Sequence, residues 1–216
     1  MNGLYGAWRT RVQRGVLVLL LGAIALPALA AAPGERTVLV LGDSLSAGYG
    51  LAANQGWVSL TARKLRATHP GWRLVNASIS GETTAGGAAR INAEIARNHP
   101  SVIVVELGAN DGLRGLDLGQ MQRNLEAIIR TSLRARAKVL LIGMRMPPNF
   151  GRQYTRGFEQ NYLVLSKRHP IAFLPFLLTP VAADRNAFQA DNLHPIASVQ
   201  PKLRDHVWVA LEPLLR

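Results

Sequence analysis

The chain has 216 residues, no cysteine and a formal net charge of +12. The lack of cysteine excludes a disulfide scaffold, a cysteine nucleophile and a cysteine-ligated metal. With 48% hydrophobic and 18% charged residues, the composition is that of a globular chain and excludes the disordered, collagen-like and coiled-coil classes.

The first residues have the pattern of a secretory signal peptide. Residues 1–34 contain no acidic side chain, and three arginines precede the apolar run 16–26. That run is short for a membrane span, which takes roughly 20 apolar residues. A small-x-small sequence follows at 28–30, so we expect cleavage after Ala30 and a periplasmic or secreted protein. An uncleaved membrane anchor is the alternative. The mature residues 31–216 are then one domain, since no linker divides them.

The basic residues are scattered along the chain. Of 25 basic residues 21 are arginine, and they occur singly, without a basic run or interleaved aromatic residues. This pattern argues against nucleic-acid binding and favours a solvated surface. Arginine pairs well with phosphate headgroups, so contact with a membrane surface is possible in principle. Because the arginines are scattered, we expect such contact to be transient at most.

Five short apolar runs predict strands buried on both faces, as in a parallel sheet. They lie at 37–41, 72–75, 101–107, 138–142 and 171–173. Amphipathic helical patterns separate or follow them at 57–66, 88–97, 118–136, 154–167 and 199–215. Asp117 with Gln120 resembles a capping box at the start of one of these helices. The alternation predicts an α/β fold, a three-layer sandwich that binds its ligand at the carboxyl ends of the strands.

A serine stands directly after the first predicted strand, in Gly42-Asp43-Ser44-Leu45. The glycine permits a tight turn, which exposes Ser44 at the mouth of the sheet. A helix N-cap is the structural alternative for this serine. A phosphate-binding loop is excluded because the sequence lacks the Gly-x-x-x-x-Gly-Lys pattern.

Hydrogen-bond donors follow the next two strands. Gly81 lies after the second strand and Asn110 after the third, in Gly108-Ala109-Asn110-Asp111. The backbone N–H groups of Ser44 and Gly81, with the amide of Asn110, can stabilise a developing oxyanion. Ordinary turn chemistry is the alternative for Asn110.

A carboxylate and an imidazole lie three residues apart near the C-terminus, as Asp191 and His194. This spacing lets the carboxylate hold one ring nitrogen and leaves the other free as a base. No further ligands accompany them, so no metal site is predicted.

These four segments, in this order and approximate spacing, resemble the four sequence blocks of the SGNH, or GDSL, hydrolase family. Within it the chain is most similar to the bacterial periplasmic thioesterase, protease and lysophospholipase branch, with its arylesterase-like members. The resemblance implies a flavodoxin-like α/β/α sandwich and a hydrolase without metal or organic cofactor. It makes Ser44 the nucleophile, His194 the general base and Asp191 the orienting carboxylate. It also implies that Gly81, Asn110 and the Ser44 amide form the oxyanion hole.

The resemblance also implies a substrate class, namely small-molecule esters and thioesters of single acyl chains, lysophospholipids among them. We expect loops 112–115 and 144–151 to line an acyl groove through Leu113, Met146, Pro147 and Phe150. We also expect a monomer. Two alternatives remain open at this stage: a carbohydrate acetyl esterase on the same fold, and a binding module that has lost its chemistry. Ordinary surface loops are the alternative for the two segments.

Overall fold

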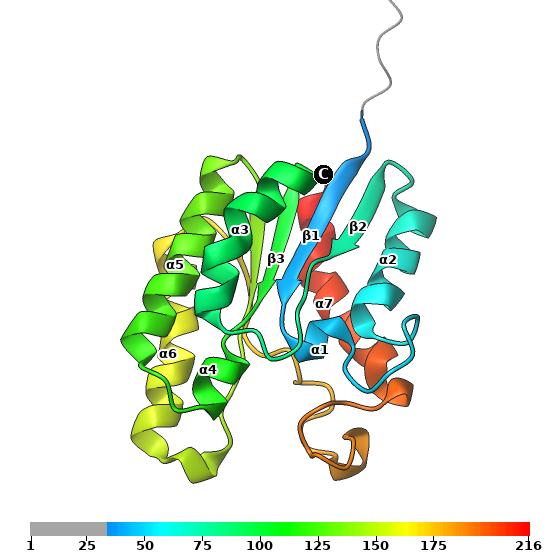
Figure 1. Ribbon diagram of the computed structural model, residues 1–216. Coiled ribbons are helices and arrows are strands. Elements are labelled where there is room, and N and C mark those ends of the chain that lie inside the picture. The colour runs from blue at the N-terminus through cyan, green and yellow to red at the C-terminus, as the bar shows by residue number, and fades with distance from the viewer. Residues whose placement is uncertain (1–33) are drawn as a thin grey trace, which may run out of the picture. The chain divides into compact units, whose positions relative to one another are not determined.

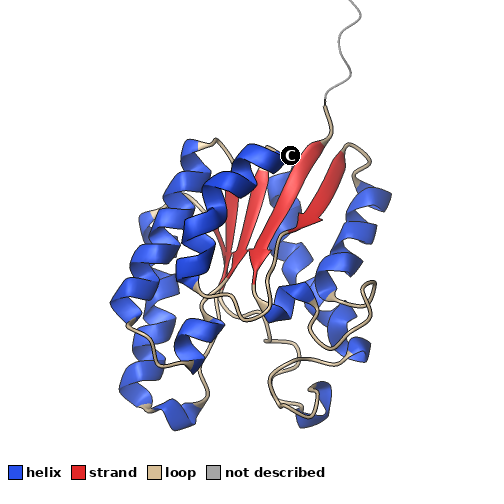
Figure 2. Cartoon of the chain, viewed as in Figure 1, coloured by secondary structure: helices blue, strands red, loops and turns tan. Residues whose placement is uncertain are grey.

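The computed structural model describes residues 34–216, which form one parallel sheet with helices on both faces (Figures 1 and 2). The sheet has the order β2-β1-β3-β4-β5. This is the flavodoxin-like order, so the predicted three-layer α/β/α sandwich is confirmed. The predicted signal peptide, residues 1–30, lies outside the described residues. The strands are β1 (Arg36–Gly42), β2 (Trp72–Asn76), β3 (Val102–Glu106), β4 (Lys138–Ile142) and β5 (Ala172–Leu174).

Two groups of helices cover the sheet (Figure 1). Helices α2 (Trp57–Thr68) and α7 (Gln200–Leu211) pack against each other on one face. On the other face α5 (Leu118–Arg134) lies between α3 (Thr84–Asn98) and α6 (Arg152–Arg168). Shorter elements lie in the connections: α1 (Ser44–Ala47), α4 (Ala109–Leu113), η1 (Pro148–Phe150), η2 (Arg185–Ala187), η3 (Ala197–Val199) and η4 (Glu212–Leu215).

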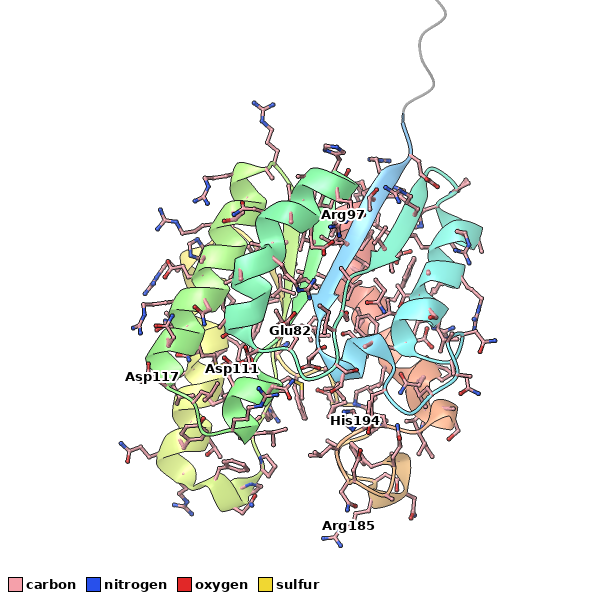
Figure 3. The ribbon with its side chains drawn as sticks, viewed as in Figure 1. Glu82, Arg97, Asp111, Asp117, Arg185 and His194 are labelled. Carbon is pink, nitrogen blue, oxygen red and sulfur yellow. The ribbon has the colours of Figure 1, made fainter. Side chains whose placement is uncertain are left out.

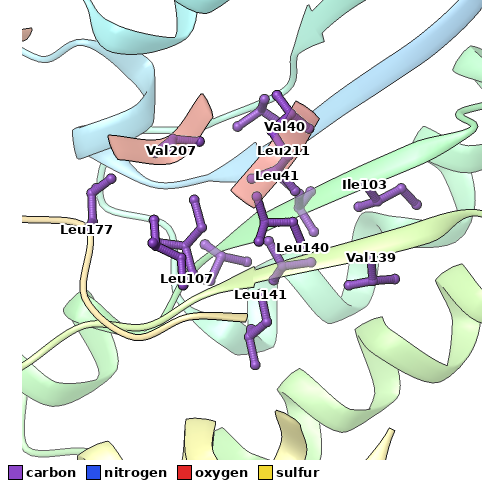
Figure 4. Close-up of a cluster of buried hydrophobic side chains, with 14 of the residues drawn as sticks. Val40, Leu41, Ile103, Leu107, Val139, Leu140, Leu141, Leu177, Val207 and Leu211 are labelled. Carbon is purple, nitrogen blue, oxygen red and sulfur yellow. The ribbon is translucent and has the colours of Figure 1, made fainter. Parts of the chain in front are cut away.

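The core lies along the central strands. Every residue of Val38–Leu41 and Val102–Val105 is fully buried, as expected for strands covered by helices on both faces. Figure 4 shows part of this cluster, in which side chains of β1, β3 and β4 gather with Val207 and Leu211 of α7. Since packing of this density resists displacement, the strands give the loops at their ends a rigid base.

All five predicted strands are present, and β4 has the predicted bounds. The helices differ more at their ends. Helix α3 begins at Thr84, four residues before its predicted start, because Thr83 caps it by accepting a hydrogen bond from the Gly86 N–H. Helix α5 ends two residues early because Arg136 has a φ of 62°. The predicted helix over 199–215 is divided into α7 and the 3-10 turns that flank it.

The predicted capping box at the start of α5 is half correct. The Asp117 carboxylate accepts a 2.6 Å hydrogen bond from the Gln120 N–H, so the cap itself is present. The Gln120 side chain makes no hydrogen bond to the Asp117 backbone N–H, and its amide donates to Asn124 instead. The reciprocal half of the motif is therefore wrong.

The sheet order divides the loops at one point. From β1 the chain turns to β2 on one side, whereas β3, β4 and β5 extend on the other. The loops that leave β1 and β3 therefore diverge, and a crevice opens between them at the carboxyl edge. Ser44 follows β1 and Asn110 follows β3, so both lie at this crevice. Among residues 34–216 no helix has the length and apolar character needed to cross a bilayer.

Close packing of α3 on the sheet gives a first test. A side chain at Gly87 would overlap Leu107 and approach Ile128. We expect Gly87→Val to lower the unfolding free energy by about 1–3 kcal/mol through overpacking. Ala93→Val is the matched control, because it places the same side chain at an exposed position of the same helix, where the cost is about 0.5 kcal/mol. Thermal unfolding measures both, and equal losses would show that α3 does not approach the sheet this closely.

Candidate active site

The serine after β1 is held at the start of a short helix. Asp43 is the N-cap of α1, and its carboxylate accepts a 3.0 Å hydrogen bond from the Leu45 N–H. Ser44 is thus the first helical residue, and the alternative that it is itself the N-cap is wrong. Its N–H has no acceptor within the helix, as is general for the first turn, and remains available to a ligand.

His194 joins this serine to a carboxylate. Its Nε2 lies 2.8 Å from the Ser44 hydroxyl, and its Nδ1 lies 2.7 Å from Asp191 Oδ2. Because an ionised carboxylate only accepts hydrogen bonds, Nδ1 carries the proton and Nε2 accepts from the hydroxyl. The structure therefore brings together the three residues that the sequence pattern singled out.

Asp191 is held in its ionised form. Its Oδ1 accepts hydrogen bonds from the backbone N–H groups of Leu193 and His194, at 2.9 and 3.0 Å. Burial alone would raise the pKa of Asp191, but these two N–H groups and the imidazole lower it to about 2. The carboxylate can thus orient the imidazole and stabilise its positive charge without taking up the proton.

The loop that carries Asp191 and His194 is closed on itself and tied to its neighbours. Phe188 and Pro195 form an antiparallel bridge, and the Gln189 N–H donates to the His194 carbonyl at 2.8 Å. The Gln189 amide also donates to the Tyr49 carbonyl at 2.9 Å, and the Tyr49 ring packs on the imidazole with 4.6 Å between centroids. These contacts hold the His194 imidazole next to Ser44.

A buried glutamine anchors the same loop from below. Gln200 donates to the Pro195 carbonyl at 3.1 Å and accepts from the Trp57 N–H at 2.9 Å. It thereby links the segment after His194 to the start of α2.

The loops after β2 and β3 bring the expected donors together. Gly81 has a φ of +79° in a turn closed by the Glu82 N–H donating to the Ile79 carbonyl, a conformation that favours glycine. The Asn110 amide donates to the Glu82 carbonyl at 2.9 Å and approaches Asp43 Oδ2 at 3.3 Å. Asn110 is thus within hydrogen-bond distance of both the Gly81 turn and the serine loop.

A third aspartate connects these two loops. The buried Asp111 carboxylate accepts from the Thr84 N–H at 2.8 Å and from the Thr84 hydroxyl at 2.5 Å. The start of α3 is therefore bound to α4, and the Gly81 turn cannot move independently of Asn110. In Figure 3 Glu82, Asp111 and His194 lie toward the end of the molecule where the strands end, and Arg97 lies at the other end.

Two buried carboxyl groups near the serine, those of Asp43 and Glu106, have raised pKa values. Burial raises the pKa of Asp43 to about 6, and the charge of Asp111 adds to the rise, although the Leu45 N–H opposes it. Burial, followed by the charge of Asp43, raises the pKa of Glu106 well above its ordinary value. Glu106 accepts a 2.6 Å hydrogen bond from the Ser46 hydroxyl, which holds α1 against the end of β3.

A cavity of about 370 Å³ opens beside the serine. Most of its lining side chains are apolar, including Leu113, Met146 and Pro147 from the expected groove. Phe150 is not among the residues that line it. The 3-10 turn η1 places this ring against Tyr154, 6.2 Å between centroids. Further lining residues are Leu45, Met144, Arg145, Phe176, Leu178 and Phe188. A mostly apolar cavity beside a few polar groups is suited to an acyl chain.

The site contains residues that the sequence argument did not single out. Asp43 and Asp111 adjoin the predicted Ser44 and Asn110, and Glu106 is the one charged residue of an otherwise apolar strand, so each carried a local signal. Tyr49 and Gln200 carried none, because their partners are remote in the chain. Among the described residues, no three His, Asp or Glu side chains are grouped in a way that could hold a metal ion.

Comparison with known proteins places the chain among acyl hydrolases. Residues 40–199 match the model of the GDSL-like lipase/acylhydrolase family. Esterase TesA of Pseudomonas aeruginosa is 43% identical over 198 residues, which cover 92% of this chain and 98% of that protein. Thioesterase 1/protease 1/lysophospholipase L1 of Escherichia coli K12 is 38% identical over 184 residues, covering 85% of this chain and 87% of that protein.

A solved structure agrees with the described fold. The crystal structure of TesA superposes with a TM-score of 0.80 and 44% sequence identity, covering 83% of this chain and 99% of that one. The likeness thus extends over most of the chain.

The buried N-cap predicts an unusual dependence of stability on pH. A raised pKa means that folded Asp43 binds a proton that the unfolded chain has released between about pH 4 and 6, so stability falls as pH rises through this range. Asp43→Asn cannot ionise and escapes this loss. Relative to the parent, we expect the variant to gain roughly 2 kcal/mol between pH 4 and pH 7.

Denaturant unfolding at the two pH values measures this gain. Asp117→Asn is the matched control, because it makes the same change at an N-cap whose side chain is 75% exposed. A gain of the same size in the control would contradict the role of burial.

Proposed function

Because the chain belongs to the GDSL-like lipase/acylhydrolase family, we propose that Ser44, His194 and Asp191 are the catalytic triad of a serine esterase. The observation that carries the proposal is the 2.8 Å contact of His194 Nε2 with the Ser44 hydroxyl. A serine hydroxyl is a weak nucleophile until a base accepts its proton, and this contact supplies the base.

The reaction follows from the geometry. Ser44 Oγ attacks the ester carbonyl carbon while its proton passes to His194 Nε2, and Asp191 stabilises the imidazolium. The tetrahedral oxyanion is bound by the Ser44 and Gly81 N–H groups and the Asn110 amide. The intermediate collapses as the imidazolium protonates the leaving alcohol or thiol, which leaves an acyl-serine. Water, deprotonated by the same imidazole, then attacks the acyl-serine, and the acid departs as Ser44 regains its proton.

The cavity and the relatives support esters and thioesters of single acyl chains as substrates. One relative is named as a thioesterase and lysophospholipase, and the cavity lining from Leu113 to Phe188 is mainly apolar. The carbohydrate acetyl esterase alternative is not favoured, because such a substrate needs a polar site. A binding module without chemistry is disfavoured by the intact hydrogen bonds between the three triad residues.

The signal-like sequence of residues 1–30 supports export to the periplasm or medium, where lipid esters are accessible. We propose that the mature protein is a monomer with no cofactor and no nucleic-acid partner.

Labelling of the nucleophile tests the proposed triad. We expect a fluorophosphonate probe to attach to Ser44, and Ser44→Ala to lose both the label and ester hydrolysis while unfolding at the parent temperature. Ser80→Ala is the matched control, since Ser80 is an exposed serine next to Gly81, and it should label normally. Peptide mass spectrometry locates the adduct, and an adduct on Ser46 or Ser80 in the parent would refute the assignment.

The oxyanion hole predicts a kinetic effect at Asn110. Asn110→Ala should lower kcat by about 10²–10³ with little change in KM, because the donor acts mainly in the transition state. Asn124→Ala is the control: its amide donates to Thr84 within the same network but does not line the cavity. It should lose stability and keep its kcat. If Asn110→Ala behaves like this control, Asn110 is only a structural residue of the turn.

A further inference from the structure

Exposed apolar side chains are concentrated at one end of the molecule. Of the six large hydrophobic side chains that are exposed in residues 34–216, four lie on loops at the carboxyl edge of the sheet. They are Tyr49, Ile79, Leu116 and Leu193, exposed by 54, 51, 43 and 42%. The other two, Leu163 and Val209, lie on the outer helices α6 and α7. We name the four together the apolar rim.

The rim residues lie on the loops that carry the candidate site residues. Tyr49 packs on His194, and Leu193 lines the cavity. Ile79 closes the turn that contains Gly81, and Leu116 follows the helix that contains Asn110 and Leu113. The four side chains come from four different loops, so their exposure is shared by the loops at this end of the sheet and does not come from one poorly packed segment.

An arginine stands within the rim. The Arg114 guanidinium donates a 2.9 Å hydrogen bond to the Gly81 carbonyl, which places it between the loops of Ile79 and Leu116. It makes no ion pair with any carboxylate of the described residues, whereas Arg145 at the cavity pairs with Glu159. Arg114 is therefore an exposed cation that forms no ion pair within the described residues and is held by its hydrogen bond to the loop of Ile79.

We propose that the apolar rim and Arg114 dock the protein on a lipid surface that carries anionic phosphate headgroups. This inference rests on the proposed function and deepens it: the enzyme takes its single-chain substrate from the lipid–water interface. Side chains such as Tyr, Ile and Leu enter the boundary between headgroups and acyl chains, and arginine meets the phosphates. The acyl chain then passes from the lipid into the apolar cavity without crossing water.

Several observations favour a lipid surface over a protein partner. Leu193 lines the apolar cavity that the acyl chain must enter, and Tyr49 packs on His194 beside it, so the surface and the cavity serve the same ligand. A guanidinium forms bidentate hydrogen bonds with phosphate, which complements the charge of the headgroups.

Vesicle binding by rim variants tests the proposal. The Ile79→Ser/Leu116→Ser double variant changes two rim side chains that do not line the cavity. Leu163→Ser/Val209→Ser is the matched control, with two exposed apolar groups removed elsewhere. We expect the rim variant to bind vesicles of phosphatidylglycerol and phosphatidylcholine about tenfold more weakly. It should also hydrolyse lysophosphatidylcholine in those vesicles about tenfold more slowly than parent and control.

A soluble short-chain ester separates this proposal from the proposed function. The parent, the rim variant, the control variant and Arg114→Gln all keep the triad intact. All four are assayed with this ester, and the rim variant should equal the parent. If the parent fails to hydrolyse the ester, the proposed function fails, whereas vesicle binding can still be measured. Equal vesicle binding by the rim and control variants would overturn the docking surface.

Arg114→Gln tests the charge separately, because glutamine keeps a polar amide but carries no positive charge. It should weaken binding to vesicles that contain phosphatidylglycerol and leave binding to pure phosphatidylcholine unchanged, and the difference should shrink at high salt. Equal weakening on both vesicles would overturn the role of Arg114. A parent dimer that dissociates in the rim variant, measured by light scattering, would instead assign the rim to a second copy of the chain.

Discussion

The hydrogen bond between His194 Nε2 and Ser44 Oγ joins residues 150 positions apart, and the rest of the structure makes it possible. The serine is fixed by β1 and by the short helix that Asp43 caps. The histidine belongs to a loop that has no strand of the sheet to hold it, so other contacts must. The bridge to Phe188, the bond from Gln189 to Tyr49 and the buried Gln200 supply them. A contact of 2.8 Å thus depends on three loops that meet at the carboxyl edge.

Three buried carboxyl groups lie near Ser44. Asp43, Glu106 and Asp111 are all buried. Asp43 accepts a hydrogen bond from the start of its own helix α1, and Glu106 and Asp111 each accept one from a neighbouring segment. Burial raises the pKa values of Asp43 and Glu106, which means that the folded protein loses stability when these groups ionise. Apolar residues would pack here at lower cost but could not accept the Leu45, Thr84 and Ser46 donors. The folded protein therefore loses some stability through these buried carboxyl groups, and in return their oxygens hold the donors of Leu45, Thr84 and Ser46 in place near Ser44.

The sequence predicted the sheet and the polar cluster well because both have short-range signatures. Buried parallel strands are apolar runs, and the residues placed after them meet at one edge whatever the lengths of the helices between. Helix ends were less predictable: small residues at Thr84–Gly87 conceal the start of α3, and the left-handed Arg136 ends α5 without a glycine. Phe150 was misplaced because a 3-10 turn redirects it. The packing of Tyr49 on His194 had no local signal at all, since only tertiary structure brings the two rings together.

The two contacts of the Asn110 amide differ in length, so the amide can be oriented by one contact and still donate to a ligand in place of the other. One contact, to the Glu82 carbonyl, is 2.9 Å long, and the other, to Asp43 Oδ2, is 3.3 Å. In the proposed oxyanion hole, an incoming oxyanion would replace the longer contact while the shorter one keeps the amide in place. A negative Asp43 so close to the oxyanion would oppose it, but the raised pKa of Asp43 lets protonation relieve that repulsion at mildly acidic pH. The proposed preorganisation of Asn110 thus rests on one short contact to a carbonyl and one longer contact to a carboxylate that an oxyanion can replace.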